Sequence, residues 1–302
     1  MRTLTFAILT TLALGGAFPV QAADLDYGVL RGPDYEPPAP SIDWNGVYFG
    51  GHGGYTSGAL GFTTTFQTLV AGNLKSTSAE EVLGASSLLT ARSARVGGGS
   101  YGAFTGFNYQ FDEAVVGLEA DYTRFERGGA TSDAIKRSAT ASTGFYETVE
   151  LKGLASTTIE DYGTIRARGG WAFGSFLPFV TGGLAIGRAQ VVDRVEIKSY
   201  GYDQTTYRAN QALTTGSPAY VNNHGYATFL QKDPAGSTVD SPMVLGRATT
   251  KVVGGIALGG GLEYALTQNF ILRGEYQYVL FNDFDGHKVN LNTVRGGAAV
   301  KF

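Results

Sequence analysis

The sequence contains no cysteine, which excludes disulfide scaffolds, thiolate metal sites and cysteine nucleophiles. Charged residues make up only 16% of its 302 residues, against about 25% in a typical soluble domain. The formal net charge is −3, whereas a nucleic-acid-binding surface is usually basic. Proline is also scarce, at 9 residues, so the chain is not of the proline-rich low-complexity type. We therefore expect no thiol chemistry and no nucleic-acid partner.

Long apolar runs are missing beyond the amino terminus, so no transmembrane helix is expected there. Residues 1–22 combine an early charge, an apolar core and a small residue before the expected cleavage after Ala22, which predicts a secretory signal peptide. A membrane-anchor helix is the alternative, but the apolar core is too short to span a bilayer comfortably. Residues 23–43 hold four of the nine prolines and are predicted to form an extended periplasmic leader.

Glycine and aromatic residues are abundant, with 44 glycines and 12% Phe, Trp and Tyr. From Trp44 onward, large apolar side chains alternate with small or charged ones, and this period of two indicates β-strands. The segment 115–125 is the clearest example, with Leu118 on one face and Glu119 on the other. Membrane strands alternate in this way because one face contacts lipid and the other faces a lumen.

Eight segments of this kind are predicted as strands: 44–55, 100–111, 115–125, 159–173, 178–190, 250–266, 270–281 and 288–302. Short connections alternate with mostly long ones, at 56–99, 126–158 and 191–249, which is typical of periplasmic turns and extracellular loops. The sequence therefore predicts an all-β fold, in which residues 44–302 form an eight-stranded antiparallel transmembrane up-and-down β-barrel with long extracellular loops. A secreted β-sandwich is the alternative, but its core would not accept the charges on the inward face.

Charged residues of both signs lie on the predicted inward face. An arginine facing lipid at the bilayer midplane costs about 2–4 kcal/mol, whereas inside a narrow barrel the charges must pair. We predict a lumenal charge network, in which neighbouring strands face each other with opposite charges, formed by Glu119, Asp121, Arg166, Arg168, Glu263, Arg273, Glu275 and Arg295. The network is expected to fill the interior, and the alternative is that it gates a small pore.

The sequence offers little from which to build an active site. It has three histidines, His52, His224 and His287, and no metal-ligand spacing. We therefore expect no enzymatic activity, no metal and no cofactor, and a lipid A-modifying hydrolase is the alternative. The loops at 56–99 and 191–249 are rich in Ser and Thr and are candidates for contact with host or other surface ligands. The tyrosines of 191–249 are the candidate contact residues.

Several short motifs occur together in the predicted strands: WNGVYFGG at 44–51, RARGGWAF at 166–173 with LPFVTGGLA at 177–185, EYALT at 263–267 with RGEY at 273–276, and VRGG at 294–297. In combination they resemble the alphaproteobacterial outer-membrane immunogenic, opacity-type proteins. The resemblance implies an OmpA-like, porin-family barrel exposed at the cell surface. It also implies that the terminal Phe302 is part of the signal for the barrel-assembly machinery. The 191–249 loop is longer than the family resemblance suggests, so no loop function is carried over.

The residues and the resemblance together predict an exported protein of the Gram-negative outer membrane. Its expected role is structural, in envelope integrity and surface contact. The expected partners are outer-membrane lipid and lipopolysaccharide, the barrel-assembly machinery during insertion, and surface ligands of the long loops. A narrow porin-like channel for small solutes or ions is the alternative function.

Overall fold

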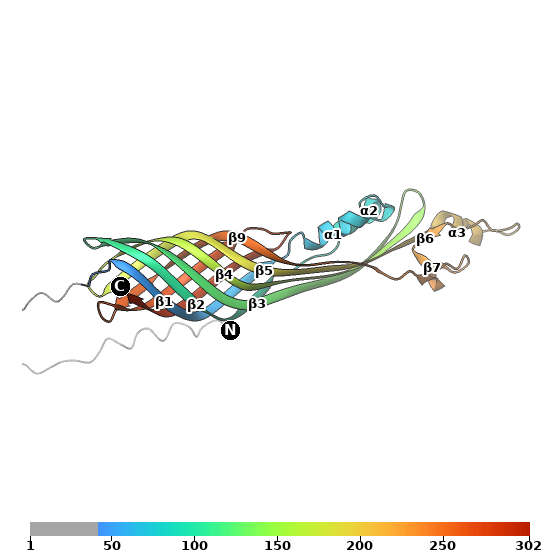
Figure 1. Cartoon of the computed structure of the whole chain (residues 1–302). Helices are drawn as coiled ribbons and strands as arrows, with labels where there is room; N and C mark the ends of the chain where they lie inside the picture. Colours follow the sequence, from blue (N-terminus) through green and yellow to red (C-terminus); the bar gives the residue numbers. More distant parts are fainter. Residues whose placement is uncertain (1–41) are drawn as a thin grey trace, which may run out of the picture. The chain divides into compact units, whose positions relative to one another are not determined.

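The alternating segments pair into a closed ring of eight antiparallel strands, in a computed structural model that describes residues 42–302 (Figure 1). In chain order these strands are β1 (Gly46–Gly61), β2 (Ala94–Phe111), β3 (Ala114–Thr140), β4 (Phe145–Trp171), β5 (Phe176–Asp203), β9 (Met243–Ala265), β10 (Phe270–Phe281) and β11 (Lys288–Lys301). Each strand pairs with its neighbours in this order, and β11 pairs with β1 to close the ring. The predicted β-barrel and its eight predicted strands are confirmed.

The amino-terminal predictions concern residues that the structure does not describe. The predicted signal peptide, residues 1–22, lies outside the described residues, and so does the predicted leader at 23–43 apart from its last two residues. Both therefore stay predictions. Within the described part of the chain, no helix is long and apolar enough to cross a bilayer.

Tight turns join the strands at the end of the ring where β1 begins and β11 ends. Asp112 lies in the two-residue turn between β2 and β3 and has a φ of +52°. Two-residue hairpin loops require such left-handed conformations because these match the twist of the flanking strands. Gly174, with a φ of +59°, plays the same part between β4 and β5. These tight connections keep the strands antiparallel and in register.

The outer surface of the ring is apolar, as the alternation predicts. Leu118, Ile165, Val180 and Leu184 are each between 64% and 67% exposed. Aromatic side chains occupy the outward positions near both ends of the ring, including Tyr109, Phe111, Trp171 and Phe173 near the tight turns and Tyr55, Tyr101 and Tyr122 near the other end. A continuous apolar band with aromatic girdles is the surface that a barrel presents to lipid.

Four strands of the ring continue beyond it and stay paired in the same sheet; we call this part the extension (residues 127–140 of β3, 145–159 of β4, 189–203 of β5 and 243–254 of β9). Figure 1 shows these strands running on past the ring. Two register irregularities mark the start of the extension, between Arg124 and Arg127 in β3 and between Ile159 and Asp161 in β4. Bulges of this kind occur at barrel rims, where they bend a strand out of the ring.

The structure corrects the predicted extent of the long loops. Much of the segment predicted as loop at 126–158 is a β3–β4 hairpin that stays paired up to Thr140 and Tyr146. β5 likewise continues to Asp203, well into the segment predicted as loop at 191–249. In β4 the inward face shifts by one residue, from Thr164 and Arg166 in the ring to Thr157 and Ile159 in the extension. The outer face of the extension is largely polar, so the apolar alternation of a membrane strand ends there.

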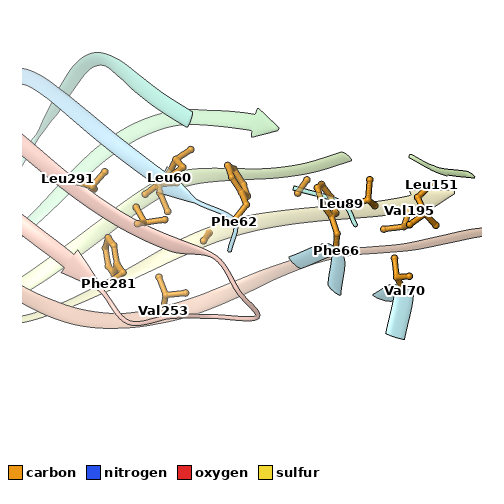
Figure 2. Close-up of a cluster of buried hydrophobic side chains, with 14 of the residues drawn as sticks. Leu60, Phe62, Phe66, Val70, Leu89, Leu151, Val195, Val253, Phe281 and Leu291 are labelled. Carbon is orange, nitrogen blue, oxygen red and sulfur yellow. The ribbon is translucent and has the colours of Figure 1, made fainter. Parts of the chain in front are cut away.

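Helices cover the inner face of the extension. The connection between β1 and β2, predicted as a loop at 56–99, contains α1 (Thr65–Leu74), α2 (Ser78–Leu83) and the 3₁₀ turn η1 (Ala85–Ser87). The Thr77 hydroxyl accepts a hydrogen bond from Glu80 N and so caps α2, and Gly84 ends this helix in the left-handed conformation. Figure 2 shows the resulting apolar cluster, which runs from Leu291 and Phe281 to Leu151 and Val195.

Short elements complete the far end of the extension. Between β5 and β9 the chain forms α3 (Gln204–Gln211), β6 (Asn223–His224), β7 (Tyr226–Thr228), η2 (Pro234–Gly236) and β8 (Thr238–Val239). The Asp203 carboxylate caps α3 by accepting a hydrogen bond from Thr206 N at 2.9 Å. β6 adds to β5, and β7 pairs with β8. We call residues 204–242 the tip.

The packing of α1 on the extension is expected to depend on Phe66, which is 2% exposed and whose ring lies against Gly153. Replacing a buried Phe by Ala typically costs about 3–5 kcal/mol, so Phe66→Ala should loosen residues 62–93 while the ring stays folded. Limited proteolysis of the protein in micelles should then cut this segment faster. Gln67→Ala, on the exposed side of the same helix, is the matched control, and its segment should be cleaved at the wild-type rate. Equal rates for both variants would contradict this packing.

Candidate functional site

The structure places all eight residues of the predicted charge network inside the barrel. They extend from five strands: Glu119 and Asp121 from β3, Arg166 and Arg168 from β4, Glu263 from β9, Arg273 and Glu275 from β10, and Arg295 from β11. None is more than 6% exposed. We call this set the ion-pair cluster. Four carboxylates and four guanidinium groups are thus held in one small volume without bulk water around them.

Arg166 lies at the centre of the ion-pair cluster. Its Nη2 lies 2.5 Å from Glu119 Oε1 and 2.8 Å from Asp121 Oδ2, and its Nη1 lies 2.5 Å from Glu275 Oε1. Nη1 also donates to Thr181 Oγ1 on β5 at 2.9 Å. The Arg166 side chain is 0% exposed, so one guanidinium connects β3, β4, β5 and β10 across the interior.

Two further arginines make paired contacts across the interior. Arg168 on β4 donates through Nη2 and Nη1 to the two oxygens of Glu263 on β9, at 2.8 and 3.2 Å. Arg273 on β10 donates through Nη1 and Nη2 to the two oxygens of Glu119 on β3, at 2.6 and 3.0 Å. Such two-pronged contacts match the planar fork of the guanidinium group to the carboxylate.

Glu119 and Asp121 on β3 contact Arg166 on β4, as expected for neighbouring strands, but the pairing of β9 with β10 differs from the expectation. Neighbouring strands were expected to pair, with Glu263 facing Arg273. Their Cα atoms are indeed opposite each other, but Arg273 Nε stays 3.8 Å from Glu263. Arg273 bonds instead to Glu119 on the opposite wall. In so narrow a barrel, inward side chains of both walls meet near the axis, and an arginine is long enough to reach across.

Arg295 joins the remaining acids. Its Nη2 lies 3.1 Å from Asp121 Oδ2 and 3.0 Å from Glu275 Oε2. Asp121 also accepts hydrogen bonds from Thr164 Oγ1 at 2.7 Å and from Gln277 Nε2 at 3.3 Å. These neutral donors satisfy lone pairs that the arginines leave free, which a buried carboxylate needs if it is to stay ionised.

Glycine and aromatic residues shape the space around the arginines. A Cβ atom at Gly259 would lie 2.7 Å from Thr181 Oγ1 and 3.0 Å from Arg166 Nη1, so a side chain there would displace Arg166. The Arg273 guanidinium lies over the rings of Phe104 and Phe179, 4.7 and 4.5 Å from their centroids. Desolvated cation–π contacts of this kind stabilise a cation by up to about 2 kcal/mol.

Apolar layers lie on both sides of the ion-pair cluster. Near the tight turns, Trp44, Leu177 and Ile271 belong to a buried group with exposures of 0 to 2%. The Trp44 backbone N donates to Gln110 Oε1 at the end of β2, and its indole Nε1 donates to Gly174 O in the β4–β5 turn. Trp44 therefore lies across this mouth of the barrel. On the other side, Leu60, Phe281 and Leu291 begin the apolar cluster that continues into the extension.

Sequence reasoning missed a second polar cluster, at the start of the extension. Thr157 Oγ1 lies 2.6 Å from His287 Nδ1, and His287 Nε2 lies 3.0 Å from Asp193 Oδ1. Both Thr157 and His287 are 0% exposed, and the rings of Phe62 and Phe284 pack against His287. The set was missed because Thr157 and Asp193 fall in segments predicted as loops. Among the described residues, no group of three or more His, Asp or Glu could hold a metal ion.

The other two histidines lie in different surroundings. His52 is in the barrel interior, where its Nε2 lies 3.3 Å from Arg295 Nη1. His224 on β6 lies 3.0 Å from the buried carboxylate of Glu147 on β4, and Ser78 at the start of α2 donates to the same carboxylate at 2.5 Å. Glu147 therefore joins the extension, α2 and the tip. Burial opposes its ionisation, but the hydrogen bonds from His224 and Ser78 outweigh that effect and hold the pKa of Glu147 below its usual range.

The terminal residue lies on the outer surface. Phe302 is 72% exposed, and its ring stacks on Phe49 with 5.7 Å between the centroids. Its backbone N donates to Val47 O at 2.9 Å, which fixes the end of the chain to β1. Its role as an assembly signal stays a prediction.

Removing the central guanidinium should destabilise the barrel strongly. In Arg166→Met the carboxylates of Glu119, Asp121 and Glu275 lose their shared partner, and breaking a buried ion pair costs about 3–5 kcal/mol. Urea unfolding of the protein in lipid vesicles should therefore show a clearly lower unfolding free energy. Arg188→Met is the matched control, because Arg188 pairs with Asp161 on the outside and its side chain is 55% exposed. Equal losses in the two variants would contradict the central role of Arg166.

The attachment of the tip should weaken at acidic pH. Because the folded-state pKa of Glu147 is lowered, its ionised form stabilises the fold above its ordinary pKa, and this stability is lost as the pH falls through the folded-state pKa. Hydrogen exchange of the backbone amides of Gly201 and His224, which pair between β5 and β6, should accelerate as the pH falls through the folded-state pKa of Glu147. Glu147→Gln should abolish this pH dependence, and Glu81→Gln, at an exposed position of α2, should keep it. Persistence of the transition in Glu147→Gln would contradict the assignment.

Comparisons with known proteins agree with the barrel geometry. No protein-family model matches the chain. The 31 kDa outer-membrane immunogenic proteins of Brucella melitensis biotype 1 and Brucella suis biovar 1 are each 28% identical to it, over 98% of this chain and 98% of theirs. This similarity extends over the full length and confirms the resemblance found in the sequence motifs.

Solved structures of outer-membrane proteins are also similar, at lower levels. Ail of Yersinia pestis, solved in complex with the heparin analogue sucrose octasulfate, is 11% identical with a TM-score of 0.30, over 85% of this chain and 99% of Ail. Neisserial surface protein A is 12% identical with a TM-score of 0.31, over 85% and 98% of the two chains. The closed ring, its apolar outer face and the Brucella relatives identify the chain as a β-barrel protein of the outer membrane, similar to the 31 kDa outer-membrane immunogenic proteins.

Proposed function

We propose that the protein is a sealed surface barrel, with a structural role in the envelope and a contact role outside it. The barrel anchors the chain in the outer membrane, and the extension carries the tip away from the bilayer surface. The proposal has two parts, a lumen that conducts neither solutes nor ions and a tip that meets surface ligands. Outer-membrane lipid and lipopolysaccharide surround the apolar band, and Phe302 serves the barrel-assembly machinery during insertion.

The observation that carries the proposal is the position of Arg166. Its guanidinium contacts carboxylates on β3 and β10, and the Arg168–Glu263 and Arg273–Glu119 pairs cross the interior beside it. An ion passing through would have to break these contacts, and each would leave an unpaired buried charge. The apolar layers around Trp44 and Phe281 add a second barrier, because neither offers partners to a hydrated ion.

One observation supports the rival function, a lipid A-modifying hydrolase. Thr157, His287 and Asp193 follow the order of nucleophile, base and acid in a hydrolase triad. However, Thr157 and His287 are fully buried beneath aromatic rings, so a lipid substrate could not reach the hydroxyl. We infer that this cluster fixes the β10–β11 turn to the extension, where Arg247 also bonds to Asp193 and Asp285. The protein is therefore proposed to have no enzymatic activity.

Conductance in planar lipid bilayers tests the sealed lumen. Purified wild-type protein in concentrated KCl at neutral pH should produce no steady channels, because the ion-pair cluster fills the interior. Arg166→Ala should at most produce brief, irregular currents, and Arg188→Ala, altered on the outside, should behave as the wild type. Steady ion-selective channels from the wild type that change with Arg166→Ala would overturn the proposal in favour of a narrow porin-like channel.

A further inference from the structure

A cavity of about 530 Å³ opens in the tip, between α3 and the chain at 218–220 and 231–232. Its volume lies in the range of small-molecule sites, which are mostly apolar with a few well-placed polar groups. The tip lies at the end of the extension that is remote from the ring (Figure 1). A ligand outside the cell would therefore reach this cavity without approaching the bilayer.

Two carboxamide groups fix the backbone on both sides of Tyr220. Asn210 Nδ2 donates to Ala219 O at 2.6 Å, and Ala219 N donates to Asn210 Oδ1 at 2.8 Å. On the other side, Val221 N donates to Gln231 Oε1 at 2.7 Å, and Gln231 Nε2 donates to Val221 O at 3.2 Å. The cavity wall is thus organised before a ligand arrives, which reduces the entropy lost on binding.

Tyrosine rings form much of the wall. Tyr220 is 69% exposed, so its ring adds little to the stability of the fold. Tyr207 is held in place, because its ring packs edge-on against Tyr202 at 5.8 Å and its hydroxyl accepts a hydrogen bond from Gln211 Nε2 at 2.6 Å. Tyrosine rings offer a rigid contact area with a polar end, which suits ligands that are apolar on one face and polar at their edges.

Three polar groups at the cavity have unused bonding capacity. Gln211 keeps its amide oxygen as an acceptor, and the Tyr207 hydroxyl keeps its proton as a donor. Lys232 forms no ion pair with any described residue. The carboxylate of the adjacent Asp233 does not pair with Lys232 but lies beside Gly236 in the following turn. The cavity therefore presents a free cation together with one hydrogen-bond donor and one acceptor.

We propose that this cavity binds an acidic sugar, a pyranose ring that carries a carboxylate. The C–H face of the ring packs on Tyr220, its hydroxyls bond to Gln211 and Tyr207, and its carboxylate pairs with Lys232. A purely apolar ligand would cover Lys232 and Gln211 without giving them partners, which costs free energy. An uncharged sugar would leave Lys232 unpaired. The inference rests on the proposed contact role of the tip and gives that role a ligand class.

Binding of a matched pair of probes to the full-length protein in micelles tests this inference. Methyl glucuronide and methyl glucoside differ only in a carboxylate that replaces a hydroxymethyl group. Saturation-transfer NMR titrations should show binding of the glucuronide, with an affinity about tenfold higher than that of the glucoside, because a charge-assisted bond adds to the ring contacts. Absence of glucuronide binding, or equal affinity for the two probes, would overturn the inference.

Variants assign the binding to the cavity. Lys232→Gln should remove the preference for the glucuronide, whereas Lys75→Gln, a matched lysine at the end of α1, should keep it. Tyr220→Ala should abolish binding of both probes, and circular dichroism should show an unchanged fold because this ring is exposed. A preference that survives in Lys232→Gln would refute the assignment. Conductance is measured separately. If the protein conducts no ions and also binds no glucuronide, only this inference is rejected and the sealed barrel stands.

Discussion

The barrel depends on the pairing of ionised side chains in an interior too narrow to hydrate them. The buried Arg166 guanidinium is balanced by the carboxylates of Glu119, Asp121 and Glu275, and removing either side would leave an unpaired buried charge. The pairs cross the lumen, so they connect opposite walls as well as neighbouring strands. The glycines of the inner face follow from the same constraint, because a side chain at Gly259 would take the space of Arg166. The same ion pairs therefore determine how the interior is packed and how opposite walls are connected.

A second constraint explains how a barrel can carry a sheet beyond the bilayer. The four strands of the extension lack a ring to bury their inner face, and in water that face needs a cover. Phe66 and Val70 of α1 provide it and join the apolar cluster that starts inside the ring (Figure 2). The Thr157–His287–Asp193 set then ties the β10–β11 turn to the extension. We infer that ring and extension are joined by packing as well as by their shared strands.

The ring was predictable because lipid and lumen impose opposite demands on alternate residues. Leu118 and Glu119 show this difference directly, and so the strands and inward charges followed from the sequence. The contact of Glu119 and Asp121 with Arg166 followed as well, but the pairs across the lumen did not, because strand order does not encode that Arg273 reaches Glu119 on the opposite wall. The extension was missed because the alternation shifts by one residue in β4 near Ile159 and because water accepts a polar outer face. The tip cavity depends on Asn210 and Gln231 bonding to backbone ten or fewer residues away, which no periodic pattern signals.

The most direct test of a sealed interior uses the absence of cysteine from the sequence. Ser100 is a buried inward residue on β2, hydrogen-bonded to Thr56, and Ser100→Cys is nearly isosteric. The account expects this thiol to resist water-soluble, membrane-impermeant thiol reagents added to either side of vesicles containing the protein. Ser132→Cys, at an exposed position of the extension, should react rapidly under the same conditions. Rapid labelling of Ser100→Cys in the folded protein would show a water-filled lumen and contradict the account.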